Sequence, residues 1–389
     1  MKKLIHTITF ITLFMAISAC SNKNLQNKGI KYQVNVPINK TLFSDEGKTP
    51  NFQDDIFTLS PSQQNNILSA VEKKQAQGLK LHKALAAVLN TKLSNFTYYG
   101  ETYNAEMTMR LNSGNCMSLA VLTTAYAKLL GLKFSYREVS TIPIFEKENN
   151  LILSSSHVQT VIYDTEFVED VDTFYLQKPG VVIDYFSNKN NRVGKSFGES
   201  TFVSMYYRNL AADALIENEL AKAFILAEKA YAYNKQNIEA INLLAVIHRR
   251  AGDDKGAENI YQAGLQIEQS SIALISNYIM LLRKQKRFDE AEVHQEKLDQ
   301  LDDPNPYHWL EQAYIAEQSH KKNKAIKYYQ KALENAPYLN QAYLGLYHIY
   351  LERGRLAKAK AMLKNALEWT YEIDQRKQYK YKLYSLAQL

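Results

Sequence analysis

The stretch Asn112-Ser113-Gly114-Asn115-Cys116-Met117-Ser118-Leu119-Ala120-Val121-Leu122 decides the interpretation of the middle of this chain. Small polar residues lead into an apolar run, and Cys116 stands at the junction. The apolar or small residues that follow recur at intervals of three and four: Leu119, Ala120, Thr123, Ala127 and Leu130. This spacing is typical of an amphipathic helix, and Gly131 is a suitable residue to end it.

The position of Cys116 predicts a nucleophile. A cysteine in the first turn of a helix lies near the positive end of the macrodipole and near unpaired backbone N–H groups. Both features favour the thiolate, so we expect a lowered thiol pKa at Cys116. The same N–H groups are suited to hold an oxyanion after the thiolate attacks a carbonyl. The alternative is an ordinary packed core cysteine.

A general base and an orienting carboxylate are predicted on strands that follow the helix. Residues 134–139, 157–163 and 181–186 have the composition of strands, which together with the helix indicates an α+β unit with an antiparallel sheet. His157 begins the second strand and is the predicted base, whereas His82 lies in a helical segment and is expected at the surface. Asp184 on the next strand would fix the imidazole tautomer. Other aspartates that compete for this role are Asp164, Asp170 and Asp172.

Five further side chains are candidates for lining the pocket or assisting the oxyanion, with ordinary packing as the alternative. They are Asn115, Gln159, Tyr103, Tyr98 and Tyr99.

These residues carry a resemblance. Gly114-Asn115-Cys116 opening a helix, followed by Ala125-Tyr126-Ala127 and Leu130-Gly131-Leu132, resembles the transglutaminase-like superfamily of papain-like folds. The resemblance implies that residues 56–190 form such a domain, with a helix-borne cysteine, a strand-borne histidine and an aspartate on the neighbouring strand. These roles fall on Cys116, His157 and Asp184. The chain departs from the pattern at Gln159, where the family often has an aromatic residue, and at Tyr185, where it often has proline.

The N-terminus resembles a bacterial lipoprotein signal. Lys2 and Lys3 precede an apolar segment, and Ile17-Ser18-Ala19-Cys20 has the form of a lipobox. We therefore expect residues 1–19 to be removed and Cys20 to be lipidated. Ser21 in place of an aspartate favours the outer membrane, facing the periplasm. Residues 20–55 are polar and predict a flexible tether.

Composition excludes several classes of function. The 389 residues have a formal charge of +7 that is spread along the chain, without the concentrated basic stripe that nucleic acid requires. No CxxC or HExxH spacing is present, and no Gly-rich phosphate loop or dinucleotide fingerprint. We therefore predict no metal, no cofactor and no nucleic-acid partner.

After the polar linker at 188–191, the chain is expected to be helical to its end. Alanine recurs every 34 residues, at Ala223, Ala257, Ala291, Ala325 and Ala359. Core positions follow four residues later at Ala227, Tyr261, Gln295, Tyr329 and Leu363, and seven later at Ala230, Gly264, Leu298, Ala332 and Ala366. This pattern resembles the tetratricopeptide repeat (TPR) and implies that residues 204–389 form an all-α superhelix of about five repeats plus a cap helix, with a groove for a protein or peptide.

Two functions follow from these observations. In the first, an outer-membrane lipoprotein presents a transglutaminase-like Cys-His-Asp domain to the periplasm, acting through a thioester as a cysteine peptidase, an amidase or an acyltransferase, with hydrolysis preferred over transfer. In the second, the chain is a non-catalytic TPR scaffold that uses the transglutaminase-like fold for binding.

Overall fold

The computed structural model describes most of the chain after residue 33. All described helices and strands lie in the unit Val36–Leu389. The described residues are 34–43, 55–93, 96–98, 101–140, 145–148, 151–154, 157–168, 170, 172–173, 178–185, 192–301, 303–370 and 373–386, with the backbone alone at 93, 140, 145–148, 151–154, 157 and 192. Cys20 and the segment around it are outside this description.

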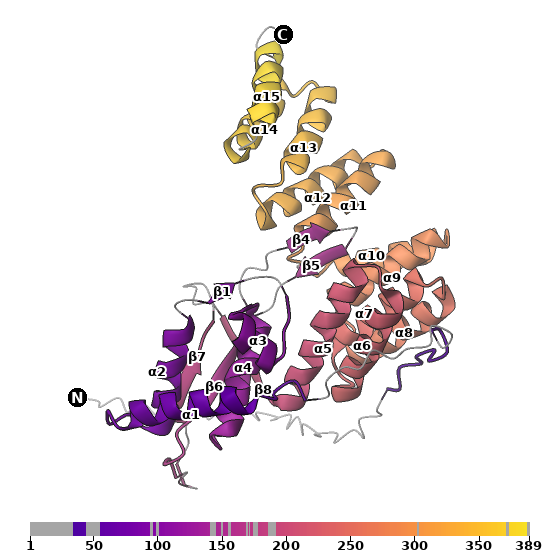
Figure 1. The fold of residues 1–389 in the computed structure, drawn as a ribbon. Helices are drawn as coiled ribbons and strands as arrows, with labels where there is room; N and C mark the ends of the chain where they lie inside the picture. Colours follow the sequence, from indigo (N-terminus) through magenta and orange to yellow (C-terminus); the bar gives the residue numbers. More distant parts are fainter. Residues whose placement is uncertain are drawn as a thin grey trace, which may run out of the picture. The chain divides into compact units, whose positions relative to one another are not determined.

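The first region is α+β, as the sequence predicts. A four-stranded antiparallel sheet has the order β7-β6-β3-β8 (Figure 1). Its strands are β3 (Phe134–Ser140), β6 (His157–Tyr163), β7 (Gly180–Ile183) and β8 (Arg192–Phe197). The short elements are β1 (Thr97–Tyr98), β2 (Ser113–Gly114), β4 (Phe145–Glu148) and β5 (Leu151–Ser154).

Strand β8 corrects the sequence analysis, which expected helix throughout after the linker. Residues 192–197 instead pair with β3, with Tyr136 opposite Phe197. The polar sequence Arg192-Val193-Gly194-Lys195-Ser196-Phe197 has no apolar run because an edge strand leaves much of its surface exposed. Local composition therefore gave no strand signal here.

Helices precede and cover this sheet. They are α1 (Pro61–Gln75), α2 (Leu81–Leu93), α3 (Ala105–Leu111) and α4 (Cys116–Leu129). Helix α1 starts with a complete capping box between Ser60 and Gln63. Helix α4 is buried at every residue from Met117 to Ala127, so it is the central helix of the region. Helix α2 contacts β7, and α4 contacts β6.

The second region is a TPR-like array of helix pairs. Its first helices, α7 (Ile238–Arg250), α9 (Ile272–Lys284), α11 (Pro306–Gln318) and α13 (Asn340–Glu352), start 34 residues apart. So do its second helices, α6 (Leu220–Tyr233), α8 (Asp254–Ile267), α10 (Phe288–Asp299), α12 (Lys322–Asn335) and α14 (Leu356–Trp369). Helix α15 (Ile373–Leu386) follows, mostly exposed.

The predicted repeat positions form the core of this array. The recurring alanines, from Ala223 to Ala359, are at most 1% exposed. Gln295, the one polar residue among the second set, is also buried, and it is satisfied by bonds to Asp299 (2.9 Å) and Arg283 (3.3 Å). The period of 34 is thus confirmed by both helix starts and burial.

Helix α5 (Glu199–Ile216) belongs to both regions. Phe202 is fully buried, and its ring stacks on Tyr136 of the sheet with centroids 4.1 Å apart. Two residues later, Ser204 donates to the Ala230 carbonyl of α6 (2.7 Å) and accepts from Asn237 (2.8 Å). Because α5 contacts β3 as α4 contacts β6 and α2 contacts β7, it is the third helix over the sheet as well as the first helix of the array.

Part of the predicted tether is an ordered strap, which we define as residues 36–43. Val36 is 4% exposed, and the Phe43 ring lies 5.2 Å from that of Phe224 on α6. The Asn39 backbone N–H donates to Nε2 of His248 (3.3 Å), whose Nδ1 bonds to the Leu244 carbonyl (2.8 Å). Apolar residues spaced singly along a polar segment are enough to hold this strap against the array.

Candidate thiol site

The turn before α4 is shaped by Asn112 and Gly114, which both have positive φ. Asn112 has φ 48° and Gly114 has φ 143°, values that L side chains rarely adopt. A Cβ on Gly114 would lie 2.6 Å from the Cβ of Ser118. Glycine is therefore required there both by backbone conformation and by close approach.

Asn115 is the N-cap of α4. Its Oδ1 accepts from the Ser118 N–H (3.0 Å), and its Nδ2 donates to Oγ1 of Thr102 (2.8 Å). Tyr103, beside it, donates its own backbone N–H to Oγ of Ser118 (2.8 Å). The structure therefore uses Asn115 and Tyr103, two of the predicted pocket residues, to hold the lead-in against the first turn of α4.

Cys116 is the first residue of α4, as predicted, and it is partly exposed. Burial raises the pKa of its thiol above the ordinary value, although the backbone N–H groups of Met117 and Cys116 bond the sulfur and act to lower it. The expected lowering is therefore wrong in direction. Removal of water from the sulfur outweighs the helix terminus.

Two tyrosines lie near the thiol. Burial raises the pKa of Tyr98 and of Tyr185, and the negative charges of Cys116 and Asp184 raise both further. Tyr185 donates its hydroxyl to Oγ1 of Thr160 on β6 (3.0 Å). Tyr98 and Tyr185 therefore share Cys116 and Asp184 as electrostatic neighbours. Tyr99 lies outside the described residues.

The structure brings Gln159 and Asp184 together. Nε2 of Gln159 donates to Oδ2 of Asp184 (2.8 Å), as the pairing of Thr160 with Ile183 in the adjoining strands allows. Gln159 is 6% exposed, and its Oε1 has no hydrogen-bond partner among the described residues. His157 begins β6 with its backbone opposite Val139, but its side chain is outside the description.

The three competing aspartates occupy other places. Asp164 lies seven residues beyond His157, about 23 Å at the rise of an extended strand. It pairs with Lys80 (3.1 Å) and faces His82 (3.6 Å), and the Glu166 N–H and Lys80 hold its pKa below the usual range. Asp170 accepts from the backbone of Asp172 (3.1 Å), and both are exposed.

His82 corrects a further expectation. Its side chain is 3% exposed rather than at the surface, because α2 turns it toward Asp164 beyond the end of β6. The helical pattern alone did not show which face of α2 meets the sheet.

Sequence reasoning missed Arg208. This residue lies on α5, and its positive charge acts to lower the pKa of Cys116. No local signal was available, because the helix that carries it reads as part of the repeats. The backbone N–H groups at the start of α4 and the charge of Arg208 both favour the ionised sulfur, but burial outweighs them.

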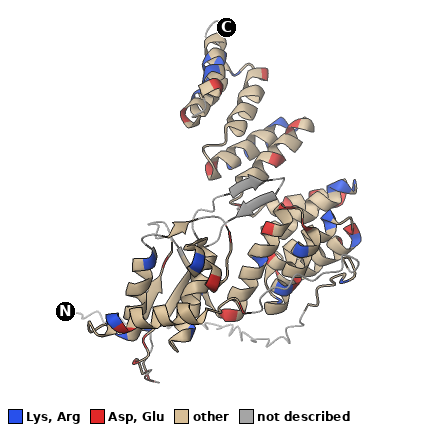
Figure 2. Cartoon of the chain, viewed as in Figure 1, with Lys and Arg blue, Asp and Glu red and all other residues tan. Residues whose placement is uncertain are grey.

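Other kinds of site are not built by the described residues. No group of three or more His, Cys, Asp or Glu side chains there could hold a metal ion. None of the described helices is long and apolar enough to cross a membrane. Basic and acidic residues are interspersed over the repeat helices (Figure 2).

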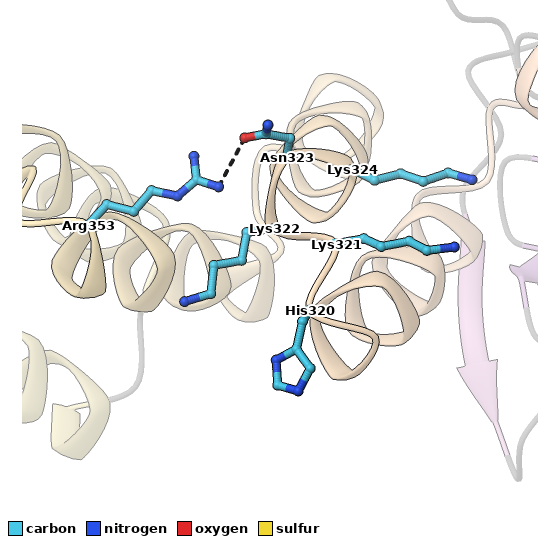
Figure 3. Close-up of a pocket in the computed structure, with 6 residues that line it drawn as sticks. All are labelled: His320, Lys321, Lys322, Asn323, Lys324 and Arg353. Atoms are coloured by element: carbon cyan, nitrogen blue, oxygen red, sulfur yellow. Dashed lines mark hydrogen bonds between the residues drawn. The ribbon is translucent and has the colours of Figure 1, made fainter.

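A hollow at the turn between α11 and α12 is lined by basic residues, but their side chains do not point toward a common centre (Figure 3). Its lining residues are His320, Lys321, Lys322, Asn323, Lys324 and Arg353. Lys321 and Lys324 extend away from Lys322, and Arg353 donates to Asn323 (3.0 Å) (Figure 3). Lys322 pairs with Glu352, and Lys324 with Glu292, so we assign no anion site here.

Comparison with known proteins finds similarity to solved structures over less than half of this chain. No family model matches the chain, and no curated protein matches it. The chain is similar to the solved structure of Pseudomonas aeruginosa pilF (17% identity, TM-score 0.41), over 49% of this chain and 86% of that one. It is also similar to PilW, a type IV pilus biogenesis factor (20%, 0.35, 48% and 92%), and to YrrB, a TPR protein with an unusual peptide-binding site (16%, 0.33, 46% and 92%). The assignment of repeats rests on the period and the helices of this chain itself.

Proposed function

We propose that this chain is a scaffold that binds a protein segment along the first helices of its repeats. One observation carries this proposal. Met280 on α9 and Tyr314 on α11 stand 34 residues apart, at the same position of successive repeats, and they are 39% and 44% exposed. Exposed apolar groups at equivalent positions form a row, because repeats stack with a regular offset. Such rows are typical of interaction surfaces.

Polar side chains on the same first helices are also suited to bind a peptide. Asn277 of α9 donates to Asn242 of α7 (3.0 Å), so side-chain amides of successive first helices lie side by side. Amides beside exposed apolar side chains suit an extended peptide, because its backbone needs hydrogen bonds and its side chains need apolar contacts.

The test is peptide selection followed by substitution. Peptides selected from a displayed random library on the wild-type chain are titrated against Met280→Asp and Tyr314→Asp. The expected result is at least a tenfold loss of affinity in both. Val293→Asp is the matched control, since Val293 is 67% exposed on the second helix α10. A loss confined to the Val293 variant would refute the proposed surface.

A second candidate function is acyl transfer at Cys116. It is favoured by the sulfur's position at the start of α4, where backbone N–H groups favour its ionised form. The bond between Gln159 and Asp184, two residues of the predicted site, also supports it. Strand positions two apart share a face, so His157 falls on the sheet face of Gln159. In the proposed step the thiol proton passes to His157, the sulfur bonds to the carbonyl carbon, and the amine leaves with that proton. Water then hydrolyses the thioester.

A thiol-directed acylating probe tests this chemistry. We expect mass spectrometry to find the probe on Cys116 of the folded wild-type chain and no labelling in Cys116→Ala. Asp184→Asn should slow labelling, while Asp172→Asn, an exposed control, should not. Equal labelling of folded and urea-unfolded chains would show that the fold does not activate the thiol.

We also propose that Cys20 anchors the chain in the outer membrane, facing the periplasm. The lipobox-like Ile17-Ser18-Ala19-Cys20 supports this, and several acyl chains give stable anchoring where one does not. Labelled palmitate should enter the wild-type chain and not a Cys20→Ser variant, and the labelled chain should fractionate with outer membranes. Palmitate incorporation into the Cys20→Ser variant would contradict this proposal.

A further inference from the structure

Helix α15 stands where the first helix of a further repeat would begin. The first helices start at residues 238, 272, 306 and 340, and α15 starts at residue 373, one residue before the next step of 34. Tyr379 of α15 is 4% exposed and belongs to the buried cluster that α13 and α14 share. Nζ of Lys382 lies 5.4 Å from the ring centroid of Tyr347 on α13. One side of α15 is therefore packed on the preceding helix pair.

Another side of α15 is uncovered. Its exposed residues, spaced as i, i+3, i+4 and i+7, are Lys377, Lys380, Tyr381 (73%) and Tyr384 (65%). This spacing places them on one face of the helix, which we call the terminal face. Ile373, which is 71% exposed, extends it by one turn. Among the described residues, which reach 386, no helix follows α15 to cover this face.

The equivalent face is buried in the preceding repeats. Thirty-four residues earlier, α13 carries four side chains that are at most 7% exposed: Tyr343, Leu346, Tyr347 and Tyr350. The matching positions of α7, α9 and α11, at further steps of 34, are at most 5% exposed. The exposure of α15 is therefore an exception to the pattern of the whole array.

The second helix of each repeat covers this face. The ring of Trp309 on α11 stacks on Tyr328 of α12 with centroids 5.6 Å apart, and Nζ of Lys331 on α12 lies 3.9 Å from the Trp309 centroid. In the repeat before, the rings of Tyr278 on α9 and His294 on α10 lie 4.9 Å apart. The array therefore shows by its own repetition what fits the terminal face, namely an α-helix in the place of a second helix.

The terminal face differs from its equivalents in charge. Lys377 and Lys380 stand where α13 has Tyr343 and Leu346. Lys377 pairs with the exposed Asp374 (3.3 Å), an interaction worth little in water. A helix that covers two lysines must supply carboxylates to satisfy them. Because the lysines lie among aromatic residues rather than on a separate polar face, an acidic helix suits this face better than a lipid surface does.

We propose that the terminal face of α15 binds an amphipathic helix of a partner protein, with glutamate or aspartate beside its apolar residues, in the place of a second helix. This surface is separate from the row that contains Met280 and Tyr314, whose next positions are His348 and Lys382. The inference therefore does not depend on the peptide surface proposed above.

A pair of designed helices tests the proposal. Both peptides have the sequence of α14, Leu356–Trp369, which packs on α13. Met362 and Asn365 are the equivalents of Tyr328 and Lys331, whose side chains reach the matching face of α11. The acidic peptide carries Met362→Glu and Asn365→Glu, and the basic peptide carries Met362→Lys and Asn365→Lys. Because a helix of this length is marginal in water, both carry a side-chain staple on the outer face.

Binding to the full chain is measured by fluorescence anisotropy at about 150 mM salt, where distant charges are screened. We expect the acidic peptide to bind about tenfold more tightly than the basic one, because two ion pairs replace two contacts between like charges. Absence of binding by the acidic peptide would overturn the proposal.

Variants of the chain locate the binding and separate it from folding. Lys377→Glu combined with Lys380→Glu should reverse the preference, so that the basic peptide binds more tightly, a gain that misfolding cannot produce. Tyr381→Ala combined with Tyr384→Ala should weaken the acidic peptide by about tenfold through lost apolar contact. Tyr314→Asp, in the row proposed to bind a peptide, should leave both affinities unchanged, so failure of one proposal is distinguishable from failure of the other.

Other occupants of the terminal face give different results. If the wild-type chain self-associates in sedimentation and Tyr381→Ala with Tyr384→Ala dissociates it, the face binds a second copy and the proposal is refuted. If phosphatidylglycerol vesicles bind the chain through Lys377 and Lys380 while neither peptide binds, the face is a lipid surface and the proposal is again refuted. Equal affinities of the two peptides for the wild type and the charge-reversed chain would also overturn it.

Discussion

The α+β region and the helical array form their cores in different ways. In the array, each helix pair packs on its sequence neighbours, so one 34-residue pattern specifies every interface. In the α+β region, strands far apart in the chain pair side by side, as β3 pairs with both β6 and β8. The difference teaches that the array can be read from local pattern, whereas the thiol site depends on contacts that cross the chain.

The largest expected effect on stability comes from a substitution in helix α5, which packs on both regions. Phe202→Ala removes a fully buried ring that stacks on Tyr136 and faces Phe57. We expect a loss of about 3–5 kcal/mol in unfolding free energy. Urea unfolding followed by Cys116 alkylation reports the α+β region, and both tryptophans, Trp309 and Trp369, report the array. Phe288→Ala, at a residue 63% exposed, is the matched control. A loss of unfolding free energy of similar size in that variant would show that the packing of Phe202 on the sheet is not the cause.

A substitution inside the array sharpens the contrast. A Cβ on Gly345 of α13 would lie 2.1 Å from Cζ of Tyr329, which is buried and donates to Glu317 (2.6 Å). Gly345→Ala should therefore destabilise the array by about 1–3 kcal/mol through overpacking. The expected signal is a lower urea midpoint by tryptophan fluorescence, with little change in Cys116 protection. Gly198→Ala, where a Cβ meets nothing within 4 Å, should leave both midpoints nearly unchanged.

Acid should weaken the array through His308. Burial lowers the pKa of His308 to about 4, and Arg283 and Lys331 also lower it. The unfolded chain binds this proton near pH 6.5, so unfolding is favoured as pH falls from 6.5 toward 4, by about 3 kcal/mol at the lower limit. His308→Phe should flatten the pH dependence of the tryptophan-detected unfolding free energy over this range. Exposed His320→Phe is the control, and an equal flattening there would show that His308 is not responsible.

The smallest expected effect concerns the strap. Phe43→Ala removes a half-buried ring that packs on Phe224, and we expect a loss of about 1 kcal/mol. Hydrogen exchange of residues 36–43 should increase while the helices of the array stay protected. Lys40→Ala breaks only an exposed ion pair with Glu228 (2.7 Å) and should change little. Equal exchange in the wild type and the Phe43 variant would show that the ring does not hold the strap.

Prediction from sequence succeeded where structure is local. The period of 34, the start of α4 at Cys116 and the strands around His157 and residues 181–183 are all signalled by spacing or apolar runs. The third strand was placed within a few residues of its observed end. The order of the sheet agrees with the expected antiparallel arrangement.

Prediction failed where contacts between residues far apart in the sequence determine the structure or the pKa. The raised pKa of Cys116 results from burial that no helix pattern reveals. The charge of Arg208, which acts to lower that pKa, comes from a helix whose sequence resembles the repeats. Strand β8 is too polar to signal itself. The strap is specified by single contacts, such as that of Asn39 with His248, between residues about two hundred positions apart.

The dual role of α5 is tested most directly by comparing two shortened chains, residues 21–198 and residues 21–237, by thermal unfolding. The longer chain keeps α5 with its partner α6, whereas the shorter one exposes Tyr136 and lacks the third helix of the sheet. We predict a cooperative transition with protected Cys116 for the chain ending at residue 237, and no cooperative transition for the chain ending at residue 198. If both chains unfold cooperatively and with the same midpoint, the claim that α5 is part of the thiol domain is contradicted.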